Sequence, residues 1–165
     1  MATKTLDDLF YETLKDIYYA ERQILKALPK MARAAQDEKL KTAFQDHKEE
    51  TEGQSERLKQ VFEIIGKRAR GKTCDAIEGI ISEGEEIMEE FKDTPALDAG
   101  LLAAAQAVEH YEISRYGTLR SWAQQLGLKD AVKLLEETLA EESKTDEKLT
   151  GLAKTAVNSA AQKAA

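Results

Sequence analysis

The chain has 165 residues, of which 31 are acidic and 24 basic, so its formal net charge is -7 and its pI is near 5.0. This charge excludes sequence-independent binding to nucleic acid, which needs a basic surface, and it opposes attachment to an anionic membrane. Two prolines and nine glycines, among abundant alanine, leucine, glutamate and lysine, favour a helical protein of one domain. No segment approaches the roughly 20 apolar residues that a membrane span needs.

The amino-terminal segment MATKTLDDLF lacks an apolar core of signal-peptide length, and the single cysteine, Cys74, excludes an internal disulfide. Both observations favour a cytoplasmic location. Cys74 is expected to be a small apolar packing residue, because no nearby base that would activate its thiol can be identified.

Apolar residues recur with a period close to 3.6 in five stretches, which predicts five helices. In chain order the expected helices cover residues 6–34, 38–65, 74–91, 96–126 and 130–157. Gly66 ends the second helix, and Gly127 is expected to form a left-handed cap at the end of the fourth. The remaining tail, residues 158–165, is rich in alanine and is expected to be flexible.

The lengths of these helices and of their connections predict the fold. Four of the helices have about 28 residues, or ~42 Å at 1.5 Å per residue, and a bundle buries four apolar faces of that length. The short first and last connections predict antiparallel pairs, whereas the middle connection is long enough to cross the bundle. We therefore expect an all-α, ferritin-like antiparallel four-helix bundle, residues 1–165, whose long crossover carries a fifth, shorter helix.

Ionisable residues interrupt the apolar faces near the midpoints of the four long helices. Midpoints lie at one height in an antiparallel bundle, so six carboxylates and one imidazole would meet in the interior, where only cations could offset their repulsion. This donor set suits two metal ions, iron before manganese or zinc. The predicted metal ligands are Glu21, His47, Glu50, Glu109, Glu112, Glu142 and Asp146.

Single members of this set admit other interpretations. A glutamate on an apolar face is often a rim residue whose carboxylate reaches water, and Glu50, about 60° from the centre of its face, fits that description best. His47 alone could be a hydrogen-bonded core histidine. The sequence does not decide between Glu49 and Glu50, or between Glu141 and Glu142, as the residue that ligates.

Two further side chains lie near the expected site. Tyr18 is within one helical turn of Glu21 and could serve as a redox-active neighbour. His110 follows Glu109 directly but faces nearly away from the core, so it is not expected to be a ligand.

Four stretches of the sequence resemble the YciF-like family of ferritin-like proteins, which are bacterial proteins linked to stress conditions. They are YYAERQILKALPKMA, AFQDHKEETEGQSERL, QAVEHYEISRYGTL and LLEETLAEESKTDEKLT, and the resemblance covers nearly the whole chain. It implies a ferritin-like bundle, a homodimer and a dinuclear metal site, whereas the biochemical activity of the family is not established.

The ligand pattern departs from that of ferritin-like di-iron proteins more broadly. Their usual Glu-x-x-His on the second helix stands here as His47-x-x-Glu50, and the last helix offers Asp146 where a histidine is common. Residues three or four apart still share a helix face, so the reversal preserves proximity. The carboxylates that resemble the expected ones are Glu21, Glu50, Glu109, Glu112 and Glu142.

Three functions are compatible with these residues. The first is a stress-response oxidoreductase that oxidises ferrous iron, or reduces peroxide or oxygen, at a carboxylate-bridged site, with His47 tuning one ion. The second is a non-catalytic, metal-stabilised dimer that binds a partner protein, and the sequence leaves open whether any substrate is turned over. A cage that stores iron is the least favoured, since a dimer cannot enclose a mineral and this chain has no basic tail for DNA.

Overall fold

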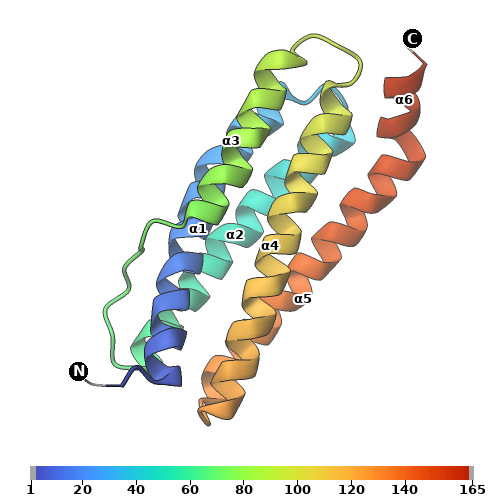
Figure 1. Cartoon of the computed structure of the whole chain (residues 1–165). Coiled ribbons are helices and arrows are strands. Elements are labelled where there is room, and N and C mark those ends of the chain that lie inside the picture. Colours follow the sequence, from blue (N-terminus) through green and yellow to red (C-terminus); the bar gives the residue numbers. More distant parts are fainter. Residues whose placement is uncertain (1–2, 164–165) are drawn as a thin grey trace.

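The computed structural model describes residues 3–163, which form helices joined by loops and contain no strand, so the predicted all-α class is confirmed (Figure 1). Its elements are α1 (Leu6–Ala34), α2 (Glu38–Ile64), α3 (Asp75–Glu90), α4 (Leu97–Gln125), α5 (Lys129–Leu152), a π-helical turn (Ala153–Val157) and α6 (Asn158–Gln162). The five predicted helices are thus present. Their predicted ends agree with the structure to within one residue, except at the end of the last helix.

The four long helices form the predicted ferritin-like bundle. α1 contacts α2 and α4, and α5 contacts the same two helices, so the four close into a ring, and α3 packs outside it against α1 and α4. Figure 1 shows that the crossover between α2 and α4 returns along the length of the bundle, so that α2 and α4 run in the same direction. Because neighbouring long helices run antiparallel and have similar lengths, the midpoints of all four lie at one level of the bundle.

Capping residues in the sequence explain where the helices begin and end. The Thr5 hydroxyl accepts from the Asp8 amide at 3.3 Å, and the Asp8 carboxylate accepts from the Thr5 amide at 2.8 Å, which is a capping box at the start of α1. Asp37 caps α2 by accepting from the Leu40 amide at 2.9 Å. Gly66 and Gly127 have φ values of 66° and 72°, so the predicted left-handed cap at Gly127 is confirmed.

One buried carboxylate fixes the height of the helices relative to one another. Asp98, in the first turn of α4, accepts from the backbone amides of Gln36 and Asp37 at 2.8 and 2.6 Å. These bonds tie the turn between α1 and α2 to the start of α4. The same bonds satisfy two amides that would otherwise lie unpaired at the end of the bundle.

The carboxyl-terminal tail is helical beyond the predicted end of the last helix. The chain passes through a π-helical turn and continues as α6, and the flexibility expected from residue 158 onward stays a prediction. Val157 is buried, and both the turn and α6 contact α4. Residues 164–165 of the predicted tail lie outside the described residues.

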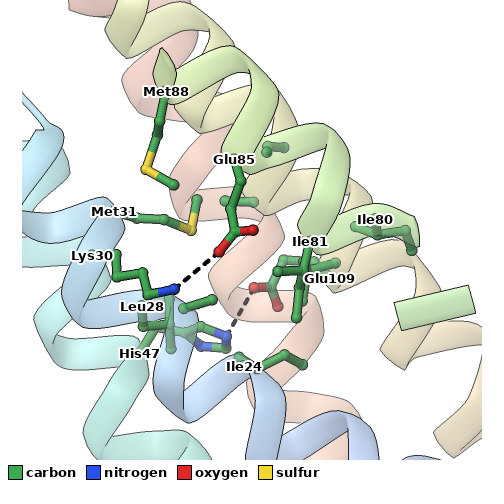
Figure 2. A pocket seen from close by; sticks show the side chains of 15 residues that line it. Ile24, Leu28, Lys30, Met31, His47, Ile80, Ile81, Glu85, Met88 and Glu109 are labelled. Atoms are coloured by element: carbon green, nitrogen blue, oxygen red, sulfur yellow. Dashed lines mark hydrogen bonds and ion pairs between the residues drawn. The ribbon is translucent and has the colours of Figure 1, made fainter. Parts of the chain in front are cut away.

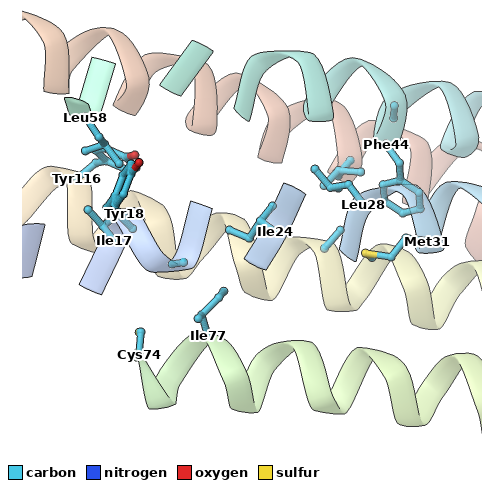
Figure 3. Packing of buried hydrophobic residues seen from close by; sticks show 14 of the residues in the cluster. Ile17, Tyr18, Ile24, Leu28, Met31, Phe44, Leu58, Cys74, Ile77 and Tyr116 are labelled. Carbon is cyan, nitrogen blue, oxygen red and sulfur yellow. The ribbon is translucent and has the colours of Figure 1, made fainter. Parts of the chain in front are cut away.

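An apolar core follows the interior of the ring, and α3 is attached to it by few side chains. Ile77 points from α3 toward the bundle and is fully buried, as Figure 3 shows. Cys74, predicted to be a packing residue, is buried at the start of α3, where its Sγ lies 2.9 Å from the Tyr111 hydroxyl oxygen. None of the helices within residues 3–163 is both long and apolar enough to cross a membrane.

Candidate metal centre

Four ionisable side chains from three helices meet halfway along the bundle. His47 comes from α2, Glu109 and Glu112 from α4, and Glu142 from α5, and each offers a ligand atom within 4.8 Å of the others. No member of this His–Glu cluster is more than 3% exposed. Glu109 and Glu112 both face inward because they are three residues apart on one helix.

Glu21 lies beside the His–Glu cluster on α1 and is fully buried. One of its carboxylate oxygens accepts a hydrogen bond from the Tyr116 hydroxyl, which is itself buried. Burial is the main reason why the pKa of Glu112 is raised, and the charges of Glu142 and Glu21 add to the shift. The predicted burial of Glu21 is therefore confirmed, and this residue extends the cluster toward α1.

Glu50 lies at the outer edge of the cluster. Its side chain is 38% exposed, and its Oε2 accepts from the Thr145 hydroxyl at 3.0 Å and lies 3.7 Å from His47 Nδ1. The nearby imidazole of His47 lowers the pKa of Glu50, against a smaller opposing effect of burial. Glu50 thus lies close to His47, as predicted, and also at the rim of the core, which was the other interpretation of this residue.

Asp146 is not brought to the cluster. Its Oδ1 accepts from Gln106 Nε2 at 3.1 Å and lies 3.2 Å from His110 Nε2, on the partly exposed seam between α4 and α5. His110 itself has a side chain that is 69% exposed, as its place on the helix predicted. Asp146 is rotated away from Glu142 along α5, and donors from α4 hold it there.

The structure separates the two pairs of neighbouring glutamates that the sequence left open. Glu142 is fully buried in the cluster, whereas Glu141 faces Arg57 and Gln54 of α2 and forms an ion pair with the arginine. Glu50 lies next to His47, whereas Glu49 is exposed.

Burial dominates the electrostatics of the carboxyls. It raises the pKa of Glu21 to about 7, although the hydrogen bond from Tyr116 opposes the shift. Burial and the neighbouring carboxylates, Glu142 first, raise the pKa of Glu112 well above its usual range. Burial and the nearby carboxyl of Glu109 do the same for Glu142.

His47 responds in the opposite sense to its burial. Burial disfavours the charged imidazole, but the carboxylates of Glu109 and Glu50 outweigh this effect and raise the pKa of His47 well above 6.5. Its Nε2 lies 3.0 Å from Glu109 Oε1, an ion pair that Figure 2 shows at the inner end of a pocket. Without a bound cation, protons on these side chains must offset the repulsion within the cluster.

Unpartnered polar atoms concentrate at this site. Among residues 3–163, eleven buried side-chain nitrogen and oxygen atoms lack a hydrogen-bond partner, and eight of them belong to the His–Glu cluster and Glu21. Buried polar atoms are normally satisfied, because each unsatisfied one costs about 1–3 kcal/mol. Carboxylate oxygens with one imidazole match the donors that iron and manganese prefer, so the residues present fit such ions. The eight atoms are Glu21 Oε2, His47 Nδ1 and Nε2, Glu109 Oε2, and both carboxylate oxygens of Glu112 and of Glu142. Of these, His47 Nε2 has Glu109 Oε1 at 3.0 Å as its ion-pair partner.

One residue of the site escaped the sequence-based prediction. Tyr116 is not among the residues predicted for the site, although it follows Glu112 by one turn and so shares its inward direction. The tyrosine considered beside Glu21 was Tyr18, whose ring instead packs edge-on against Phe62 with the centroids 5.5 Å apart. The spacing of four residues between Glu112 and Tyr116 could have indicated that Tyr116 faces the site.

These pKa shifts predict that the metal-free protein loses stability as the pH rises. Glu21 has its ordinary pKa of 4.5 when unfolded and about 7 when folded, so between these values the folded state holds a proton that the unfolded state has lost. The stabilisation is fully present below 4.5 and is lost as the pH rises through 7, which amounts to about 3 kcal/mol for this carboxyl. Raised pKa values of Glu112, Glu142 and His47 act in the same direction.

Urea unfolding between pH 5 and pH 8, in the presence of a chelator, measures this loss. The Glu21→Gln variant is the control, because it cannot ionise at this position and should lose less stability over the same range. A free energy of unfolding that stays constant or increases from pH 5 to pH 8 would contradict the assignment of these carboxyls as buried and protonated.

The fold is that of a ferritin-like bundle, because four long helices close into a ring and a crossover helix packs outside it. Buried carboxylates and a histidine lie at the middle of the ring. Residues 5–162 match the family model described as a domain of unknown function, DUF892. The chain belongs to this family.

The similarity to individual relatives extends over nearly the whole chain. Protein YciF of Escherichia coli (strain K12) is 50% identical over 163 residues, which are 98% of each chain. The crystal structure of the E. coli stress protein YciF matches with a TM-score of 0.90, covering 94% of this chain and 99% of that one. YcfI of Rhodopseudomonas palustris, for which a structural role has been suggested, matches with a TM-score of 0.87 at 49% identity, covering 89% and 94%.

Proposed function

We propose that the interior of this bundle binds two metal ions, iron in the first place and manganese or zinc as alternatives, and that the protein oxidises ferrous iron with a small oxidant. The observation that carries the proposal is the set of eight unpartnered buried atoms at one level of the interior. Asp146 is left out of the ligand set, because Gln106 and His110 engage it elsewhere. The residues that would hold the ions are Glu21, His47, Glu109, Glu112 and Glu142, with Glu50 at the outer edge.

Ferrous ions bound there would supply one electron each, so that two of them and two protons convert dioxygen to hydrogen peroxide, or hydrogen peroxide to two waters, and end as ferric ions. The chain contributes the arrangement of the donors. Tyr116 holds one oxygen of Glu21 and leaves the other free, and Glu109 and Glu112 offer neighbouring carboxylates from a single helix. Protons held by Glu112 and Glu142 in the metal-free protein would be released when cations replace them.

The test is to add ferrous iron to the metal-free protein under anaerobic conditions, then hydrogen peroxide or dioxygen, and to follow the formation of ferric iron. We expect faster oxidation with the wild type than with a Glu109→Gln, Glu142→Gln double variant, which keeps the size of both side chains and removes their charge. The control is a Glu89→Gln, Glu147→Gln double variant, which changes two exposed glutamates of α3 and α5. Equal rates for the wild type and the cluster variant would refute the proposal.

A second candidate is a metal-stabilised homodimer that binds a partner protein without turnover. Two findings support this candidate. A structural role has been suggested for YcfI, and the matching family is described as a domain of unknown function. Ile80 and Ile87 on α3 remain partly exposed and would belong to the contact surface. Strong stabilisation by metal without iron oxidation, and loss of the dimer on replacing Ile80 and Ile87 by asparagine, would support this function over the first.

A further inference from the structure

An apolar cavity reaches the His–Glu cluster from the side of the crossover helix. It has a volume of about 30 Å³ and lies where α1, α3 and α4 meet, with His47 and Glu109 at its inner end (Figure 2). About 10–15 Å³ of such space suffices for one water-sized molecule. At the outer side, Lys30 Nζ on α1 lies 2.9 Å from Glu85 Oε1 on α3, and both side chains are about half exposed.

The lining of this cavity selects uncharged molecules. Apart from the two residues of the cluster and the Lys30–Glu85 pair, its walls consist of aliphatic side chains, glycine and two methionines, Met31 and Met88. A hydrated ion would lose its water in such surroundings without gaining partners, which is strongly unfavourable. A second hollow approaches His47 between α2 and α5, but charged side chains line it: Asp46, Glu49, Glu50, Lys144 and Lys148.

Small residues keep the space open. Gly84 of α3 is buried and faces Ala104 of α4, and a Cβ added at Gly84 would lie 3.5 Å from the Ala104 Cβ, an ordinary contact distance. Packing therefore does not require glycine at this position. Larger side chains could fill the gap between the helices, and unfilled space in a core costs stability.

We propose that this cavity is the access pocket through which dioxygen reaches the metal centre, an inference that rests on the proposed function. Dioxygen is small, uncharged and apolar, so it matches the aliphatic walls better than hydrogen peroxide, which would lose its hydrogen bonds to water there. The inner end, at His47 and Glu109, brings the molecule directly to the ligand set. Two ferrous ions would each give it one electron there, and two protons complete its conversion to hydrogen peroxide.

Xenon, an uncharged apolar probe, tests the pocket independently of iron. The probe is applied under pressure to protein without added metal, and NMR follows the methyl groups of Met31 and Met88. We expect both signals to shift in the wild type and in Gly79→Leu, and neither to shift in Gly84→Leu. Gly79 is the matched control, because it lies on the same helix and a Cβ added there meets nothing within 4 Å. No xenon-induced shift in the wild type would overturn the proposal.

Iron oxidation tests the role of the pocket. In Gly84→Leu we expect the oxidation of bound ferrous iron by dioxygen to slow at least tenfold, with the iron content unchanged and with a smaller effect on oxidation by hydrogen peroxide. If Gly84→Leu fails to fold, saturating xenon should slow the dioxygen reaction of the wild type, with helium at the same pressure as the control. Dioxygen oxidation at the wild-type rate, with the pocket filled by leucine or by xenon, refutes the access route alone. Protein that binds no iron refutes the proposed function as well.

Discussion

Manganese(II) at about a thousand times its dissociation constant is expected to raise the free energy of unfolding by about 4 kcal/mol for each ion bound. For a chain of this length that corresponds to an increase in Tm of roughly 10 °C. The physical reason is that a cation offsets the charge around eight buried atoms that lack a hydrogen-bond partner among the described residues. Manganese is chosen because this measurement then reports binding without oxidation by dioxygen or peroxide.

The matched variants for this measurement lie on α5. Glu142→Gln removes the charge of a fully buried carboxyl in the cluster, and Glu147→Gln makes the same change at an exposed position five residues along the helix. We expect the increase in Tm to be lost in the first variant and kept in the second. It should also be larger at pH 8 than at pH 5, because protons on Glu21 and Glu112 compete with the cation. No increase in the wild type would contradict the metal site itself.

The positions of the helices were predictable because local chemistry determines them. A capping box at Thr5 and Asp8, an N-cap at Asp37 and left-handed glycines at 66 and 127 act within a few residues of chain. The bundle followed from helix length and loop length. The end of the last helix did not, because no glycine or proline marks where it ends and the chain continues through a π-helical turn into α6.

The candidate site was predictable only as far as helix periodicity reaches. Glu21, Glu112 and Glu142 lie at the centres of apolar faces, and each proved to be fully buried. For residues away from the centre of a face, such as Glu50 and Asp146, side chains of neighbouring helices decide where the carboxylate lies.

The sequence alone does not show which side chains of neighbouring helices bind these carboxylates. The Thr145 hydroxyl holds Glu50, and the Gln106 amide holds Asp146, across contacts between helices. Such contacts depend on how far each helix is shifted along its neighbour, and the Asp98 bonds that help to fix this shift join residues more than 60 positions apart.

Replacing Glu112 by leucine is expected to stabilise the metal-free protein and to abolish its metal binding. Both oxygens of Glu112 are buried without a hydrogen-bond partner among residues 3–163, and burial and its acidic neighbours raise its pKa. Leucine has a similar volume and no polar atoms, and exchanging buried charged groups for apolar ones has stabilised proteins by about 1–4 kcal/mol. Urea unfolding at pH 8 with a chelator should therefore give a higher free energy of unfolding for Glu112→Leu than for the wild type.

The exposed residue Glu147 again supplies the control, because Glu147→Leu makes the same chemical change outside the core and should alter stability by no more than about 0.5 kcal/mol. If Glu112→Leu proved less stable than the wild type without metal, the carboxyl would be satisfied within the protein and the case for bound cations would fail. If Glu112→Leu gains stability and loses manganese binding, the Glu112 carboxylate lowers the free energy of unfolding of the metal-free protein and is needed to bind the metal. Retention of such a residue at the expense of stability is the mark of a functional site.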